Sequence, residues 1–280
     1  MENIKIISTN ETDTNIKEFL KQNGFTATLI KKVKYGGVFV NGKNVTMRGI
    51  VKHGDEVFVN LPEDVSEGIP PIDMPLDIIY EDEYMIAVNK PRNMPTHPSK
   101  GNSLPTLANG VMAHFKGNHT FRSINRLDRD TSGIVLIAKD AYSAAALSSS
   151  MKKGEFKKKY IAKVEGILEQ KQGIIDAPIR REAEGEMKRI VAPDGKRAIT
   201  EYKVIFENNG RSIVEVILHT GRTHQIRVHF AYIGHPLCAD FLYGERIEGE
   251  CYSLHCYELS LPHPKTGEMI TLSAQCDFLS

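Results

Sequence analysis

The sequence predicts an α+β protein whose sheet is mixed but mainly antiparallel, preceded by a small N-terminal α/β domain. Segments with the length and composition of strands outnumber helical segments and follow one another at irregular spacing, which disfavours a doubly wound parallel sheet. An acidic stretch also separates a basic first block from the rest of the chain. A length of 280 residues suits two unequal domains.

The first block is predicted to contain two short helices followed by a small sheet. Apolar residues recur at helical spacing after Asn15, a candidate N-cap, and again after Thr26. Gly36 has the conformational freedom that ends the second helix. Strands are then expected over 38–40 and 57–59, with turn residues between them.

The acidic stretch is predicted to be a linker between two domains. Residues 63–83 contain eight acidic and no basic residues, whereas residues 1–62 contain nine basic and six acidic ones. The same stretch is rich in proline, which is typical of a connection. We therefore predict a first domain over 1–62, a linker over 63–75 and a second domain over 76–280.

The second domain is predicted to consist mostly of strands. Six apolar runs rich in β-branched residues have strand length, namely 76–80, 85–88, 134–137, 160–164, 198–202 and 212–218. Helices are expected over 104–115 and 141–151, the second with Asp140 at its N-terminus.

The composition limits the classes of function. A net charge of +1 does not by itself indicate a nucleic-acid partner, and 41% hydrophobic residues are enough to form a core. The chain shows no apolar run of about 18 residues and no secretory leader, so a cytoplasmic protein without a membrane partner is predicted. The cysteines lack paired spacing and are expected to be buried, reduced thiols: Cys238, Cys251, Cys256 and Cys276.

The first segment that could carry chemistry is 126–133, just before an apolar strand. Asp128 and Asp130 lie among Arg126 and Arg129, whose charges favour an ionised carboxylate. Such a carboxylate can act as a nucleophile or a base. An Arg-Asp ion-pair network that only closes a loop is an equally good interpretation of the spacing.

A second polar segment runs from Arg222 to His229. It holds two arginines, two histidines and a glutamine, for which phosphate or carboxylate is the natural partner, and phosphate is favoured. In a strand, Gln225, Arg227 and His229 would share one face, whereas a helix would scatter them. A zinc site at His224 and His229 lacks a nearby acidic or cysteine ligand and is disfavoured.

A third segment, 152–160, has five lysines before Tyr160. Lysines beside an aromatic ring can hold a phosphodiester and stack a base. A solvated connection with Tyr160 in the core is the alternative.

Together, the three segments resemble the RluA family of RNA pseudouridine synthases, from about residue 76 to the C-terminus. The family's motifs match 126–133, 159–166 and 221–229. Shorter similar pieces lie in the same order, among them Asn89-Lys90-Pro91, Gly234-His-Pro236 with Asp240, and Leu254-His255. One departure is Asn125, where the family usually has histidine.

The resemblance implies the fold of pseudouridine synthases and the isomerisation of uridine to pseudouridine in RNA, without cofactor or metal. Asp128 would be the catalytic carboxylate, Arg227 would pair with it, and Tyr160 would lie against the uracil. Whether Asp128 adds to the sugar or assists loss of a C2′ proton stays open. Asn125 keeps hydrogen-bonding capacity, so we interpret it as a supporting change.

The resemblance also implies RNA contacts in the second domain. The residues expected to bind RNA are Arg126, Arg129, Arg222, His224, Gln225, Lys157, Lys158 and Lys159. Their contribution should weaken with salt.

The first domain resembles the alpha-L RNA-binding domain over about 50 residues. The resemblance rests on the basic second helix and on the segment 37–43 followed by Gly54-Asp55. RNA-binding residues implied there are Lys31, Lys32, Lys34 and Lys43. A basic helix that is merely solvated is the alternative interpretation.

Two other functions fit parts of this evidence. One is a non-catalytic RNA-binding or ribosome-assembly protein on the same fold. The other is a nucleoside or glycoside hydrolase that uses Asp128 and Asp130 as an acid/base pair, since residues two apart on a strand point the same way. Ribosomal RNA, preferably of the large subunit, is the favoured substrate, transfer RNA is possible, and a monomer is expected.

Overall fold

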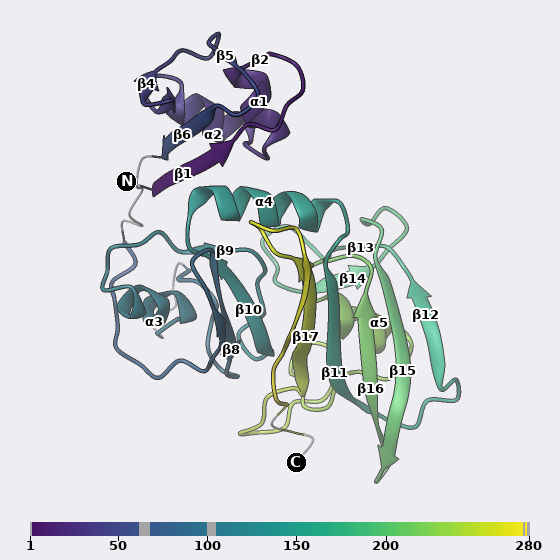
Figure 1. Ribbon diagram of the computed structural model, residues 1–280. Coiled ribbons are helices and arrows are strands. Elements are labelled where there is room, and N and C mark those ends of the chain that lie inside the picture. The colour runs from purple at the N-terminus through teal and green to yellow at the C-terminus, as the bar shows by residue number, and fades with distance from the viewer. Residues whose placement is uncertain (1, 62–67, 100–104, 277, 279–280) are drawn as a thin grey trace.

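The computed structural model describes residues 2–61, 68–99, 105–276 and 278 (Figure 1). Residues 62–67 lie outside the described residues, and they include the acidic start of the predicted linker. The start of the helix predicted over 104–115 lies outside them as well. The domain boundaries therefore stay a prediction.

The N-terminal unit contains the two predicted helices and a four-stranded sheet. The sheet has the order β1-β6-β3-β4, and two further short strands, β2 and β5, pair with each other. Strand β1 was not predicted; it pairs antiparallel with β6 along its whole length. The elements are β1 (Glu2–Ile7), β2 (Thr14–Asn15), α1 (Ile16–Gln22), α2 (Ala27–Val33), β3 (Val38–Val40), β4 (Lys43–Asn44), β5 (Ile50–Val51) and β6 (Glu56–Leu61).

The predicted cap of the first helix is confirmed, and the second helix begins after Thr26 as predicted, with Thr26 as its cap. The Asn15 side chain accepts a hydrogen bond from the backbone of Glu18 at the start of α1, and Thr26 accepts one from Leu29 at the start of α2. These bonds satisfy backbone donors that have no partner inside the helix. The apolar faces of α1 and α2 then pack on the small sheet and form a core of their own.

The rest of the chain is organised around a ten-stranded, mainly antiparallel sheet, which confirms the predicted fold class. Its order is β12-β15-β16-β11-β17-β10-β8-β7, with β18 paired to β17 and β9 to β10. The strands of this part, including a separate two-stranded β13-β14 sheet, are β7 (Ile78–Glu81), β8 (Met85–Lys90), β9 (Arg122–Ser123), β10 (Ser132–Ala138), β11 (Lys157–Glu165), β12 (Gln172–Asp176), β13 (Ile179–Arg181), β14 (Arg189–Val191), β15 (Ile199–Asn208), β16 (Arg211–Leu218), β17 (Leu254–Pro262) and β18 (Met269–Ser273).

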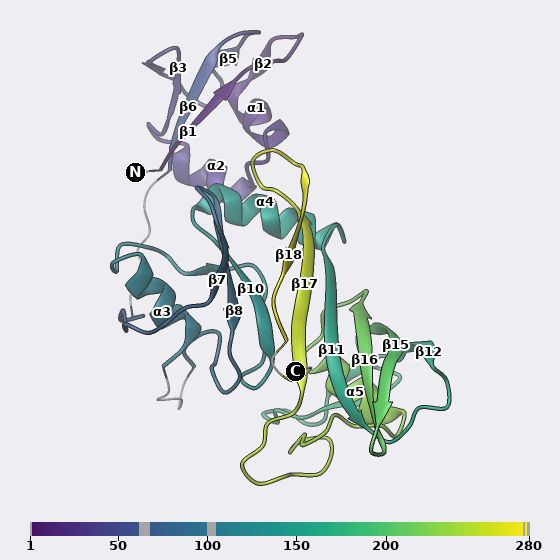
Figure 2. The same ribbon diagram turned by 60° about the horizontal axis from the view of Figure 1, so that its bottom comes forward.

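Three helices accompany the large sheet: α3 (Leu107–His114), α4 (Ala141–Lys152) and α5 (Gln225–Tyr232). The predicted cap of α4 is present, since Asp140 accepts a hydrogen bond from the Ser143 backbone. Figures 1 and 2 show α4 lying across the ends of the central strands, between the large sheet and the N-terminal unit. Buried residues from the strands and all three helices form one continuous core.

Two halves of the large sheet meet at a short parallel junction between β10 and β17. Only Ser132 with His255 and Gly133 with Cys256 are in register there. Gly133 has φ of 110°, and a Cβ at this position would lie 2.2 Å from the Cys256 carbonyl oxygen. Glycine is therefore required where the two strands approach.

The four cysteines are free, as predicted, but only Cys238 and Cys256 are buried, whereas Cys251 and Cys276 are half-buried. Within the described ranges, no helix combines the length and apolar character needed to cross a membrane.

Candidate active site

The loop that contains Asp128 leads into β10 and is held by buried side chains. Lys90 is fully buried and its ammonium group donates to the carbonyls of Pro91, Met94 and Arg129, at 2.8, 2.8 and 3.0 Å. Burial lowers the pKa of Lys90 to about 7, although the charges of Asp130 and Asp128 act to raise it. These bonds fix the loop backbone directly after Asp128.

The other side of the loop is fixed by side chains that bond to backbone groups. The Thr96 hydroxyl donates to the Leu127 carbonyl at 2.8 Å. Asn125 is buried; its amide nitrogen donates to Ile134 and its oxygen accepts from the Leu136 backbone. Asn125 thus anchors the loop to β10 and lies on the supporting side, as the sequence predicted for a change from histidine.

Asp128 reaches out of this loop toward two cationic or ionisable groups. Its carboxylate lies 3.6 Å from the Arg227 guanidinium and 3.7 Å from His224. The Asp128 side chain is 34% exposed, whereas Arg227 is 4% exposed. A reachable carboxylate therefore faces a buried cation.

Arg227 pairs with Asp128, as the resemblance implied, but its closest partner is Asp240. Two hydrogen bonds of 2.7 Å join the guanidinium to the Asp240 carboxylate. The guanidinium carbon also lies 4.2 Å from the Tyr252 ring centroid and 4.9 Å from that of Tyr243. Burial acts to lower the pKa of Arg227, but the hydrogen bonds to Asp240 act in the opposite direction and the pKa is raised overall, so the guanidinium stays charged.

His224 joins Asp128 to Tyr243. Its Nδ1 lies 2.7 Å from the Tyr243 hydroxyl, which also accepts the backbone N–H of Arg189 at 2.9 Å. His224 has φ of 58°, an uncommon conformation for a residue other than glycine. Burial lowers the pKa of His224, so the ring is held neutral beside Asp128.

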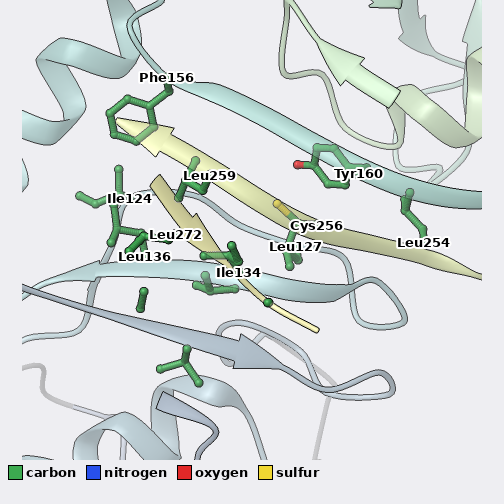
Figure 3. Packing of buried hydrophobic residues seen from close by; sticks show 14 of the residues in the cluster. Ile124, Leu127, Ile134, Leu136, Phe156, Tyr160, Leu254, Cys256, Leu259 and Leu272 are labelled. Carbon is green, nitrogen blue, oxygen red and sulfur yellow. The ribbon is translucent and has the colours of Figure 1, made fainter. Parts of the chain in front are cut away.

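Tyr160 lies in β11 beside Cys256 of β17, and the two are paired in register (Figure 3). Its side chain is buried, and burial raises the pKa of Tyr160 well above its usual range; contact with Cys256 and the charge of Asp128 add to this effect. Tyr160 is consequently a neutral phenol whose hydroxyl lies within the electrostatic reach of Asp128.

The segment after His224 is a helix, α5, so its side chains are distributed rather than aligned. The Gln225 amide and the His229 ring both bond to Thr200, at 3.0 and 2.8 Å, one turn apart on one face. Arg227 points elsewhere, to Asp240. His229 also bonds to the Ala177 carbonyl at 2.9 Å, which leaves it no role in a zinc site with His224.

The prediction that Gln225 binds RNA is corrected by this geometry. The side chain is buried, its amide donates to Ile199 and Thr200, and its oxygen accepts from Thr220 and Arg222. It has no surface to offer RNA and instead fixes the turn before α5.

Asp130 does not share the site with Asp128. The segment is a turn, closed by a hydrogen bond from Thr131 to the Asp128 carbonyl, rather than a strand. Asp130 is buried and binds Arg129 through two bonds of 2.9 and 3.1 Å. The premise of the hydrolase hypothesis, two carboxylates that point together, is therefore wrong.

The three lysines before Tyr160 do not form one patch with its ring. Lys157 is exposed, Lys158 is half-buried against the sulfur of Met151, and Lys159 forms an ion pair of 3.0 Å with Glu258. Alternation along β11 puts only Lys158 on the face of Tyr160. Burial also lowers the pKa of Lys158.

The remaining predicted RNA contacts are on the surface. Arg126 is exposed beside Asp128, Arg129 is half exposed, and Arg222 is exposed although its Nε donates to the Arg197 carbonyl at 3.0 Å. The lysines predicted to bind RNA in the N-terminal unit are all exposed: Lys31, Lys32, Lys34 and Lys43.

Sequence reasoning missed three contributors to the site. The sequence showed Asp240 only within a short stretch that resembles the family, and no role was predicted for it. The ring of Tyr252 lies over the guanidinium of Arg227, and the hydroxyls of Tyr252 and Thr131 share a hydrogen bond of 3.1 Å. Lys90 likewise belongs to a short stretch that resembles the family, and only its burial shows that it holds the loop of Asp128.

Comparisons with known proteins agree with the motifs. A family profile described as RNA pseudouridylate synthase matches residues 84–232. The Bacillus subtilis protein named "Uncharacterized RNA pseudouridine synthase YjbO" is 41% identical over 266 residues, 92% of this chain and 94% of that protein. The ribosomal large subunit pseudouridine synthase D of Neisseria meningitidis is 35% identical over 260 residues, 86% of this chain and 69% of that protein.

A solved structure agrees as well. The human RNA pseudouridylate synthase domain containing 1 superposes with a TM-score of 0.62 and 26% identity, covering 74% of this chain and 85% of that one. The fold, the site and these matches define the class: an RNA pseudouridine synthase, an enzyme that isomerises uridine to pseudouridine in RNA. Within this class, the chain belongs to the RluA-type family.

Proposed function

We propose that this enzyme modifies large-subunit ribosomal RNA and that Asp128 is its catalytic carboxylate. The observation that carries the assignment is the reachable carboxylate of Asp128, which lies 3.6 Å from the buried guanidinium of Arg227. Relatives named ribosomal large subunit pseudouridine synthase D, at 35% and 34% identity, support the choice of RNA.

In the proposed reaction, the bond from C1′ to N1 of uridine breaks, the uracil turns, and C5 is joined to C1′. Positive charge develops on the ribose as the first bond breaks, and the Asp128 carboxylate stabilises it. Asp128 either adds to C1′, in a bond that breaks when C5 attacks C1′, or assists loss of the C2′ proton, which returns to C2′ as C5 attacks C1′. Because the base must leave its stack, the target uridine is flipped into the site.

Arg227 and Tyr160 have distinct roles in this proposal. Arg227 is a fixed cation that orients the Asp128 carboxylate before the ribose arrives. Tyr160 lies against the uracil and, as a neutral phenol, relays the C5 proton when the base becomes aromatic again. Exposed Arg126 and Arg222 bind flanking phosphates.

The N-terminal unit is proposed to act as an alpha-L type RNA-binding domain through its exposed lysines. Its two capped helices on a small sheet and the basic outer side of α2 support this role. We also predict that the protein is a monomer and that it acts in the cytoplasm. Sedimentation velocity tests the first prediction, and cell fractionation tests the second.

The test is a pseudouridine map of ribosomal and transfer RNA from cells lacking the gene, by nucleoside mass spectrometry and carbodiimide primer extension. Complementation uses wild type, Asp128→Asn, and Asp194→Asn as a matched control at an exposed carboxylate. We expect large-subunit sites to be lost and to return with wild type and Asp194→Asn only. Sites lost from transfer RNA would contradict the proposed substrate, and restoration by Asp128→Asn would contradict the proposed catalytic carboxylate.

A further inference from the structure

Helix α4 has a second packing surface besides the one that covers the large sheet. Leu147 is fully buried in the main core. Ala141, Tyr142 and Ala145 instead pack against the separate core of the N-terminal unit. Ala141 and Ala145 are one turn apart on the same side of the helix. The helix is thus shared by two cores.

The contact is specific and involves the connection between α1 and α2. The Tyr142 hydroxyl donates a hydrogen bond of 3.0 Å to the Asn23 carbonyl. The Tyr142 ring lies 5.0 Å from that of Phe25, at an interplanar angle of 50°. Gly24 lies between these two contacts, and a Cβ there would be 3.7 Å from the Tyr142 hydroxyl.

The sequence of α4 suits close docking. Except for Tyr142, Leu147 and the last two residues, the helix contains only alanine and serine. Small side chains let a neighbouring element approach closely, and one tyrosine then supplies both an apolar ring and a polar end. Burial raises the pKa of Tyr142, which keeps its hydroxyl a donor to Asn23.

The docking surface and the catalytic carboxylate lie at opposite ends of β10. Asp128 precedes the first residue of this strand, and α4 follows its last residue. Seven strand residues span roughly 20 Å at a rise of about 3.3 Å per residue. RNA that contacts the docked unit therefore binds beyond the opposite end of this strand from the Asp128 loop, and its span has to match that separation to present a uridine to Asp128.

We propose that α4 is a docking platform that holds the N-terminal unit in one orientation, with Tyr142 as the positioning residue, and thereby selects structured RNA of a matching span. The proposal rests on the proposed RNA-binding role of this unit. A fixed orientation raises the effective concentration of the second contact once the first has formed.

The test places a lysine inside or outside the interface of the full-length protein. Ala145→Lys puts a charged side chain against the N-terminal core, while Ser149→Lys adds the same side chain one turn later at an exposed position. Small-angle scattering reports whether the unit is released. Steady-state kinetics use the natural structured RNA, identified as above, and a short hairpin containing only its target uridine.

We expect Ala145→Lys to increase the radius of gyration and to raise KM for the structured RNA roughly tenfold with kcat unchanged. Ser149→Lys should match wild type, and all three proteins should act equally on the hairpin. An unchanged radius of gyration, an unchanged KM despite release, or an equal loss on the hairpin would each overturn the proposal. Failure of wild type on every RNA would instead contradict the proposed substrate.

Discussion

Arg227 and Asp240 form a buried, bidentate ion pair, with both nitrogen–oxygen distances at 2.7 Å. The pair leaves the remaining guanidinium nitrogen 3.6 Å from Asp128. Asp240 also accepts the backbone N–H groups of Leu242 and Tyr243, so its own position is fixed. The orientation of the cation that faces Asp128 is therefore set before any substrate binds.

Replacement of Asp240 by asparagine should be strongly destabilising. The variant keeps the shape of the side chain but leaves Arg227 as a buried charge without its counterion, which costs about 3–5 kcal/mol. Urea unfolding measures the change. Asp194→Asn, which breaks the exposed pair with Arg180, serves as control and should cost about 0–1 kcal/mol. Equal effects of the two variants would show that Asp240 has no special structural role.

Gly133→Ala should prevent the β10–β17 junction from forming as it stands. The new methyl group would lie 2.2 Å from the Cys256 carbonyl oxygen and 2.5 Å from its nitrogen, and φ is 110°. We expect a loss of several kcal/mol, or no folded protein, as measured by thermal unfolding. Gly221→Ala is the control, because nothing lies within 4 Å of its Cβ. A Gly133→Ala protein as stable as wild type would refute the requirement for glycine at the junction.

Tyr160→Phe should separate the role of the hydroxyl from that of the ring. The ring packs in the core and is retained, so the unfolding temperature should stay close to that of wild type. Loss of the proton relay should lower the single-turnover rate by about 10²-fold with little effect on RNA affinity. Tyr202→Phe removes a hydroxyl elsewhere in the same sheet and should leave the rate unchanged. A full rate in Tyr160→Phe would exclude a proton relay.

Acid should destabilise the protein as the pH falls below about 6.5. Burial lowers the pKa of His119, His224 and His229 in the folded state. The unfolded chain therefore takes up protons first, and stability falls as pH decreases. Unfolding midpoints between pH 7.5 and 5.5 should fall less steeply for His119→Gln than for wild type. Replacement of exposed His53 is the control, and an identical slope for His119→Gln would contradict the argument.

Much of the fold could be predicted because local signals and tertiary structure agree. Asn15, Thr26 and Asp140 each cap the helix that the sequence assigned to them. Helix α5 was left open because His224 starts it without a side-chain cap and in a left-handed conformation. Strand β17 escaped prediction because its polar and apolar residues do not alternate regularly.

The family resemblance, rather than spacing alone, pointed to Asp128, Tyr160 and Arg227 as site residues. The structure places the carboxylate of Asp128 3.6 Å from the Arg227 guanidinium, while the catalytic roles stay a proposal. The sequence could not show that Arg227 binds Asp240 most closely, because that contact depends on the course of the loop after α5. Nor could charge patterns distinguish Asp130, neutralised by Arg129, from Asp128, which remains accessible.

The parallel junction of β10 and β17 also bears on how the enzyme is made. The Ser132 hydroxyl bonds to the His255 ring at 2.9 Å across a separation of 123 residues. A ribosome that adds about 5–20 residues per second needs several seconds to synthesise that interval. Until β17 has left the exit tunnel, strand β10, which follows the loop of Asp128, lacks one of its neighbours, so a nascent chain cannot begin catalysis before β17 has been synthesised.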